Sequence, residues 1–153
     1  MICRPAEASF QKGQKALSEG RLLEAQALFE ASLKLSKELG EGPIQPRYLS
    51  YYGLCLSRQR GLLAEAKEIC ERAAESEPYN AELWLNLARV SMARGDRANV
   101  HRAVVSGLAV APTHPGLIDH LKRIGVRRRP LLPFLPRRHG LNRLAGRLVR
   151  WLS

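Results

Sequence analysis

A spacing of 34 residues recurs through the second half of the chain and constrains its fold more than any other feature. The segments "RGLLAEAKEICERAAESEPYN" and "RGDRANVHRAVVSGLAVAPTH" match along their length. The matched positions are Gly61 with Gly95, Ala66 with Val100, Cys70 with Val104, Ala73 with Gly107, and Pro78 with Pro112. Self-similarity at a fixed period of this size indicates an array of repeated structural units.

A third unit precedes these two at a longer spacing. Within "EGRLLEAQALFEASLKL", the residues Gly20, Ala25, Phe29 and Ser32 lie 41 positions before Gly61, Ala66, Cys70 and Ala73. The seven extra residues fall between Lys37 and Arg47, where "GEGPIQP" predicts a loop. In the second unit, the distance in sequence from Gly53 to the turn glycine Gly61 differs by one residue from the repeat pattern. The first helix of this unit can therefore be aligned in either of two registers.

Each unit is expected to be a pair of helices. Small residues recur where two helices approach to the lower end of the usual separation, about 8–10 Å between axes. Gly20, Gly61 and Gly95 each follow a helical stretch and suit the left-handed conformation that ends a helix. Pro78 and Pro112 stop the second helices, because the residue before a proline is pushed out of helical geometry. No segment shows sustained strand alternation, so the fold class is all-α.

These positions resemble the tetratricopeptide repeat (TPR) family, whose unit is a pair of antiparallel helices, over about residues 6–112. The segment "AELWLNLARVSMARGDRANVHRAVVSGLAVAP" carries the resemblance best, at Trp84, Leu87, Ala88, Gly95, Val100, Val104, Gly107 and Pro112. The family usually has a large residue where Ser91 stands, and alanine where Val100 and Gly107 stand. The resemblance implies a right-handed solenoid of about three helix pairs.

The end of the stack is expected at "HPGLIDHLKRIG". Pro115 suits a first helical turn, and the apolar stripe that follows predicts a capping helix that covers the last pair. Its members are Leu117, Ile118, Leu121 and Ile124, and Gly125 ends it. The chain is therefore divided into a solenoid with its capping helix, residues 1–125, and an arginine- and proline-rich tail, residues 126–153.

The net charge of +11 is concentrated in that tail. Up to Lys122 the chain holds 16 Lys and Arg against 14 Asp and Glu, whereas from Arg123 onward it holds nine Arg and no acidic residue. Such segregation is typical of an interaction arm. The sequence shows no secretory leader and no apolar run of about 18 residues, so a cytoplasmic protein is expected. The alanine- and arginine-rich composition favours a bacterial source.

Residue patterns that would indicate catalysis or metal binding are missing from the sequence. The four histidines are not at metal-ligand spacing, and no glycine-rich phosphate loop or nucleophile motif occurs. Cys55 and Cys70 are interpreted as small core residues. We therefore expect no enzymatic activity, no cofactor and no metal.

Binding of a protein or peptide is the function that the resemblance implies. TPR solenoids hold ligands in a concave groove lined by the first helix of each repeat. Carried over by position, the expected groove residues are Phe10, Gln14, Tyr51, Arg58, Asn86 and Arg89. One subset of the family grips a C-terminal carboxylate with lysines and asparagines. Phe10, Gln14 and Glu82 stand where that clamp needs Lys or Asn, so it is not predicted here.

Two patterns occur in the tail. Pro130, Pro133 and Pro136 recur every third residue, which matches the turn of a polyproline II helix. Residues 141–152 predict a short amphipathic helix with Trp151 and leucines on one side and arginines on the other. The arginines of the tail that are candidates for binding are Arg127, Arg128, Arg129, Arg137, Arg138, Arg143, Arg147 and Arg150.

The apolar side of such a helix needs a cover, and three are open: the solenoid itself, another protein, or a lipid interface. Arginine opposite leucine and tryptophan is typical of helices at an anionic membrane surface, which would place the protein at the cytoplasmic face of the inner membrane. Oligomerisation through this helix would give the same pattern. Nucleic acid or a ribonucleoprotein is a further candidate for the arm, through phosphate contacts.

Overall fold

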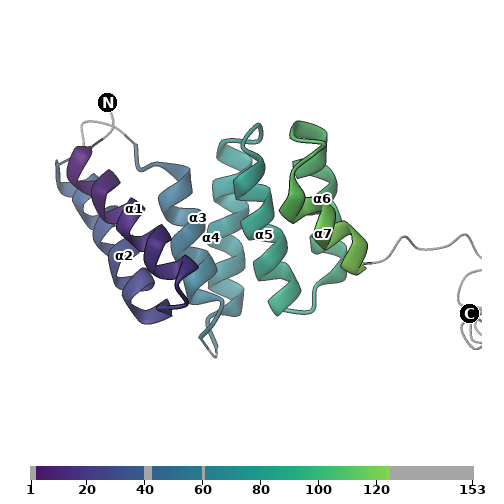
Figure 1. The fold of residues 1–153 in the computed structure, drawn as a ribbon, viewed down its shortest axis with the longest axis horizontal. Helices are drawn as coiled ribbons and strands as arrows, with labels where there is room; N and C mark the ends of the chain where they lie inside the picture. The colour runs from purple at the N-terminus through teal and green to yellow at the C-terminus, as the bar shows by residue number, and fades with distance from the viewer. Residues whose placement is uncertain (1–2, 40–42, 60, 125–153) are drawn as a thin grey trace, which may run out of the picture.

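Helices follow one another along the chain in the computed structural model, which describes residues 3–39, 43–59 and 61–124. In order they are α1 (Arg4–Ser18), α2 (Leu22–Leu39), α3 (Pro46–Leu56), α4 (Leu63–Ser76), α5 (Ala81–Ala93), α6 (Arg97–Val110) and α7 (Pro115–Ile124). Figure 1 shows them side by side in chain order. No strand occurs in these ranges, which confirms the all-α prediction.

The helices form three antiparallel pairs and a single final helix. α1 packs on α2, α3 on α4, and α5 on α6, and each pair also packs on the next (Figure 1). α7 packs mainly on α6 and touches α5. The stack therefore has the helical-solenoid architecture expected from the repeat. The proline run, the helix over residues 141–152 and the boundary at residues 125 and 126 all lie outside the described residues.

Three glycines set the turn inside each pair. Gly20, Gly61 and Gly95 have φ of 78°, 90° and 75°, and each second helix begins two residues later. After α1, the amide of Gly20 donates to Leu17 O and that of Arg21 to Ala16 O, at 3.1 and 2.9 Å. These two bonds satisfy carbonyls that the end of a helix leaves open. The predicted left-handed glycines are confirmed.

The second helices bury the same three positions in every repeat. These are Ala25, Phe29 and Ser32 in α2, Ala66, Cys70 and Ala73 in α4, and Val100, Val104 and Gly107 in α6, all of them buried. The matched positions of the sequence therefore form an equivalent buried seam in each repeat. Stacking of the pairs then lets each repeat cover the apolar side of the next.

The structure settles the register of Gly53. A Cβ atom on Gly13 would lie 2.7 Å from the Phe29 ring, and one on Gly53 would lie 2.8 Å from Cys70 Sγ. Phe29 and Cys70 are matched positions, so Gly13 and Gly53 are matched as well. The one extra residue between Gly53 and Gly61 therefore reflects the longer connection between α3 and α4, and the helix register is the same as in the first pair. Leu56 ends α3 five positions before Gly61, whereas α1 and α5 end two positions before their glycines.

The seven extra residues of the first repeat are divided among three places. α2 has 18 residues whereas α4 and α6 have 14 each. The connection from α2 to α3 has two residues more than that from α4 to α5. The α3–α4 connection has three residues more than the α5–α6 connection, but α3 has two fewer than α5, which leaves a net difference of one. The insertion was predicted between Lys37 and Arg47, and six of the seven residues lie there.

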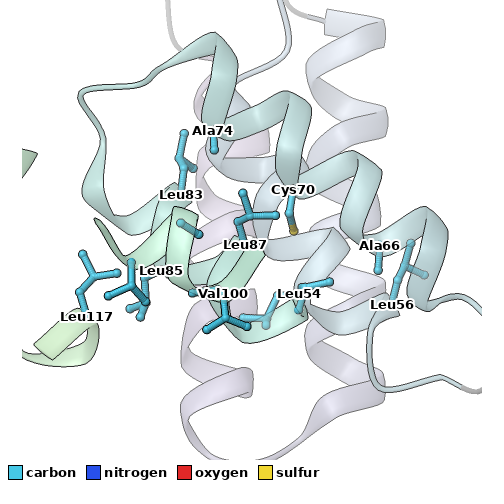
Figure 2. Close-up of a cluster of buried hydrophobic side chains, with 14 residues drawn as sticks. Leu54, Leu56, Ala66, Cys70, Ala74, Leu83, Leu85, Leu87, Val100 and Leu117 are labelled. Carbon is cyan, nitrogen blue, oxygen red and sulfur yellow. The ribbon is translucent and has the colours of Figure 1, made fainter. Parts of the chain in front are cut away.

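Two buried clusters hold the stack together. The first is aromatic and lies between α1, α2 and α3, with Phe10, Phe29 and Tyr48 at its centre. The second is aliphatic, and Figure 2 shows its side chains converging from α3 to α7. Cys55 and Cys70 are fully buried, and burial raises their thiol pKa values to about 11 and about 12. This confirms that both are core residues.

The capping helix explains one departure from the family pattern. Leu117 of α7 is fully buried, and a Cβ atom on Gly107 would lie 2.6 Å from its Cδ1 and 2.9 Å from Trp84 Cβ. The alanine that the family usually has at this position would therefore collide with the cap. Glycine in α6 is the residue that allows α7 to approach.

Restoring that alanine is expected to destabilise the protein. Gly107→Ala improves helix propensity by about 1 kcal/mol, yet the crowding against Leu117 and Trp84 should lower the free energy of unfolding by about 1–3 kcal/mol. Urea denaturation measures the difference. A Gly107→Ala, Leu117→Ala double variant should lose less than the sum of the two single variants, because the shorter side chain vacates the space. A more stable Gly107→Ala variant would contradict this account of the cap.

Candidate functional site

Polar side chains from successive first helices are joined at the surface of the stack. The Tyr51 hydroxyl of α3 donates to Glu82 Oε1 of α5 at 3.1 Å. The other carboxylate oxygen of Glu82 lies 3.4 Å from Nε2 of His114, in the connection that leads into α7. Arg89, one helical turn further along α5 than Asn86, is exposed. We call Gln14, Tyr51, Glu82, Arg89 and His114 the first-helix wall.

Aromatic packing fixes Tyr51 from behind. Its ring lies edge-on to Phe10 with centroids 5.3 Å apart, and 5.4 Å from the ring of Phe29. Tyr51 is only partly buried, so one side of the ring and the hydroxyl stay near the surface. Burial, and then the negative charge of Glu82, raise the pKa of Tyr51, which keeps its hydroxyl protonated as a donor. The position is rigid before any ligand arrives.

Glu7 organises the outer end of this surface. Its Oε2 accepts from Arg47 Nη2 at 2.5 Å and from the Tyr48 hydroxyl at 2.8 Å. The Arg47 guanidinium lies over the Phe10 ring at 5.2 Å and over the Tyr48 ring at 5.4 Å. Such cation–π contacts add to an ion pair that is partly shielded from water. The carboxylate and the guanidinium are thus already engaged with each other.

A buried amide positions Arg89. Asn86 is fully buried, and its Nδ2 donates to Ser50 Oγ at 3.2 Å. Its Oδ1 accepts from Arg89 Nη1 at 3.2 Å. The amide therefore connects α3 to α5 and holds the arginine side chain at one surface position. No ion pair of Arg89 occurs among the described residues, so its charge is available to a ligand.

The structure corrects two of the expected groove residues. Phe10 and Asn86 are buried, so neither can contact a partner directly, and both instead support the residues that can. Alignment to a family's repeat positions does not show which of the aligned side chains are buried in a particular member. Gln14 and Tyr51 are partly exposed, and Arg58 and Arg89 are exposed. Arg58 lies in the α3–α4 connection, because α3 ends at Leu56. The tail arginines and Trp151 lie outside the described residues.

Sequence reasoning missed His114 and the Glu7–Arg47 pair. His114 lies just before the cap and reaches Glu82 only because α7 folds back on the last pair. Glu7 and Arg47 are 40 residues apart and meet only after α1 and α3 are stacked. No repeat position marks any of the three.

The described ranges show neither a candidate metal site nor a membrane-spanning helix. They contain no cluster of three histidine, cysteine or acidic side chains that could hold a metal ion. None of their helices combines the length and apolar character that crossing a membrane requires.

The Glu7–Tyr48 pair predicts how stability depends on pH. Burial, and then the hydrogen bond to Glu7, raise the pKa of Tyr48 to about 12 from its ordinary 10.0. The folded protein therefore retains a proton that the unfolded chain releases, and the stability present below the ordinary pKa is lost as the pH rises through the folded value. Urea denaturation at a series of alkaline pH values should show a shallower loss in Tyr48→Phe. Equal slopes in the two proteins would contradict this.

Comparison with known proteins agrees with this geometry. Residues 57–115 match the family described as tetratricopeptide repeat. No curated protein matches the chain. Among solved structures, 15 chains match, and one is the TPR domain of Arabidopsis OM64. That domain is 14% identical, with a TM-score of 0.64, over 81% of this chain and 97% of its own.

Domains of this fold are typically modules for protein interaction rather than enzymes. The matched segment begins just after α3, ends at the first residue of α7, and contains α4, α5 and α6. The structural match extends the likeness beyond that segment, over most of the described residues. Residues 57–115 therefore match the tetratricopeptide repeat family, and the described residues have the fold of a tetratricopeptide repeat domain.

Proposed function

We propose that this protein is a non-enzymatic adaptor that holds a segment of a partner protein against its first-helix wall. One observation carries the proposal. A chain of contacts runs from Tyr51 through Glu82 to His114, so that α3, α5 and the start of the cap present a single connected surface. Because tyrosine and arginine dominate binding hot spots, Tyr51 and Arg89 are the main contact residues.

The charges of the wall favour a partner segment with acidic side chains. Glu7 is already paired with Arg47, and Glu82 with Tyr51 and His114. Arg58 and Arg89 are exposed and have no ion pair within the described ranges. A carboxylate placed against either guanidinium would form charge-assisted hydrogen bonds, which are stronger than those between neutral groups. The part of Tyr51 that remains exposed offers packing for an adjacent apolar side chain.

The tail completes the proposed adaptor by attaching it to an anionic membrane surface or an acidic partner. Support comes from the sequence alone, in which Arg143, Arg147 and Arg150 share one side of the predicted helix and Trp151 lies on the other. Each arginine near an anionic bilayer contributes about 1 kcal/mol. Association with nucleic acid, or oligomerisation through this helix, would use the same residues and is separated from membrane attachment by experiment.

Charge reversal at the wall tests the groove. The full-length protein is applied to an array of random peptides, and bound sequences should be enriched in Asp and Glu. Arg89→Glu should weaken the selected peptides about 10-fold or more in fluorescence anisotropy, because one attractive charge becomes repulsive. Arg102→Glu is the matched control, since Arg102 is an exposed arginine of a second helix. The proposed site would be contradicted if both variants lost the same peptide affinity, or if Arg89→Glu bound the peptides as tightly as the wild type.

Vesicle flotation tests the tail. Replacing Arg143, Arg147 and Arg150 together by Gln should weaken binding to phosphatidylserine-containing vesicles about 100-fold, from about 1 kcal/mol per arginine. The control replaces three exposed arginines of the solenoid, Arg94, Arg97 and Arg102, by Gln. Unchanged vesicle binding in the tail variant would contradict membrane attachment. Binding of RNA with no binding of vesicles would favour the nucleic-acid alternative.

A further inference from the structure

A second surface, separate from the first-helix wall, lies at the edge of the stack where α3 begins and α4 ends. It is a pocket of about 550 Å³ between the start of α3, the last turns of α4 and the connection into α5. Its apolar lining includes Ile44, Pro46, Leu49 and Ile69. Pockets with this lining and a few polar groups at the rim are the usual binding sites for small ligands and peptide segments.

An exposed aromatic ring stands at the rim of this pocket. Tyr79 is 74% exposed, although it borders apolar residues that a partner would bury. The turn that carries it is held in place, because Trp84 Nε1 donates to Pro78 O at 2.7 Å and the amide of Asn80 donates to Glu77 O at 3.0 Å. An exposed aromatic ring on a turn that is already fixed can be covered with little further loss of backbone conformational entropy.

Acidic residues outnumber basic ones on the helix that forms one side of the pocket. Glu77 and Arg72 line the pocket itself, and Glu65, Glu68 and Glu75 are exposed on α4. Over residues 63–79 there are five Glu, two basic residues and a net charge of 2 − 5 = −3, in a protein whose total is +11. No ion pair within the described ranges uses these four carboxylates. The pocket therefore favours an apolar ligand, and the net negative charge of residues 63–79 favours one with basic residues that lie along α4.

The chain itself contains a segment of that chemistry. "RRRPLLPFLPRR", residues 127–138, places prolines at every third position between two arginine clusters. Proline-rich segments of this period dock in grooves lined by aromatic residues, because the polyproline II conformation is extended and already ordered. The arginines on either side complement the glutamates of α4. No other part of the sequence combines prolines at this spacing with basic clusters on both sides.

The length of the tail favours a second copy of the chain over the same copy. The pocket lies at the start of α3 and the end of α4, and Figure 1 shows α7 ending at the other edge of the stack. The direct path therefore covers the length of α7, about 15 Å, and two helix-to-helix steps of about 8–10 Å each. The step along α7 and the steps across the helices are at right angles, so the straight-line distance through the packed helices is about 22–25 Å. The six steps from Ile124 to Pro130 span at most about 22 Å when fully extended. A path around the surface is longer, whereas a neighbouring molecule has no such limit.

We propose that residues 130–136 of one molecule dock in the Tyr79 pocket of another, with the neighbouring arginines paired to the glutamates of α4. The solenoid would thus associate with a second copy through its tail and pocket. The site is distinct from the first-helix wall, so that surface stays available to a partner. Residues 141–152 also remain free for the membrane attachment proposed above.

Sedimentation equilibrium of full-length proteins tests this docking through complementation. The wild type should associate reversibly, more weakly as salt is raised, since the arginine–glutamate pairs are screened. Tyr79→Ala removes the pocket's ring, and the triple variant Pro130→Ala, Pro133→Ala, Pro136→Ala removes the ligand. Each variant alone should associate at least about 10-fold more weakly than the wild type. Mixing the two should restore association, because one supplies an intact tail and the other an intact pocket.

A matched control and a binding assay make the outcome decisive. Leu23→Ala removes another exposed side chain, 80% exposed and far from the pocket lining, and should associate like the wild type. A labelled peptide of residues 126–139 should bind the triple proline variant, and Tyr79→Ala in that protein should weaken it about 10-fold or more. A monomeric wild type, or a mixture that does not regain association, would overturn the proposal. A peptide affinity that is unchanged by Tyr79→Ala would also contradict the proposal.

Discussion

The structure depends on one close approach that is repeated in every helix pair. In the first two pairs a glycine of the first helix faces a buried residue of the second, so closely that a Cβ atom would lie 2.7 or 2.8 Å from it. In the third pair Ala88, also buried, stands at the matched position. Because the first helix contributes almost no side chain here, the residue on the second helix decides what fills the interface.

That residue differs between repeats, and its size determines which side chains pack around it, including one that reaches the surface. In the first repeat it is Phe29, whose ring packs on Phe10 and Tyr51. In the second it is Cys70, a small thiol that leaves the neighbouring core to aliphatic side chains. The aromatic cluster therefore forms only at the N-terminal end of the stack, and it is what holds Tyr51 rigidly where the first-helix wall begins. A packing choice in the core thus fixes the chemistry that this end of the protein can present.

The sequence predicts the parts of this arrangement that repeat. Three turn glycines, three buried seams and the capping helix follow from spacing and apolar stripes, because the same local physics recurs in each unit. The candidate site is less predictable. Phe10 and Asn86 occupy groove positions by alignment, yet one is taken into the aromatic cluster and the other bridges Ser50 to Arg89. The site also uses His114, which only the cap brings close to Glu82. Contacts between distant residues of this kind leave no periodic signal.

Departures from the period carry as much information as the period itself. The lengthened connection from α2 to α3 supplies Pro43 and Ile44 to the pocket wall, and the ordinary connection from α4 to α5 supplies Tyr79. At the other end of the stack, Gly107 replaces the usual alanine and lets Leu117 close the last repeat. A strictly regular array would present the same edge at every repeat. Here the irregular residues form the pocket at one edge and let the cap cover the last repeat at the other, so the two ends of the stack differ in shape and chemistry.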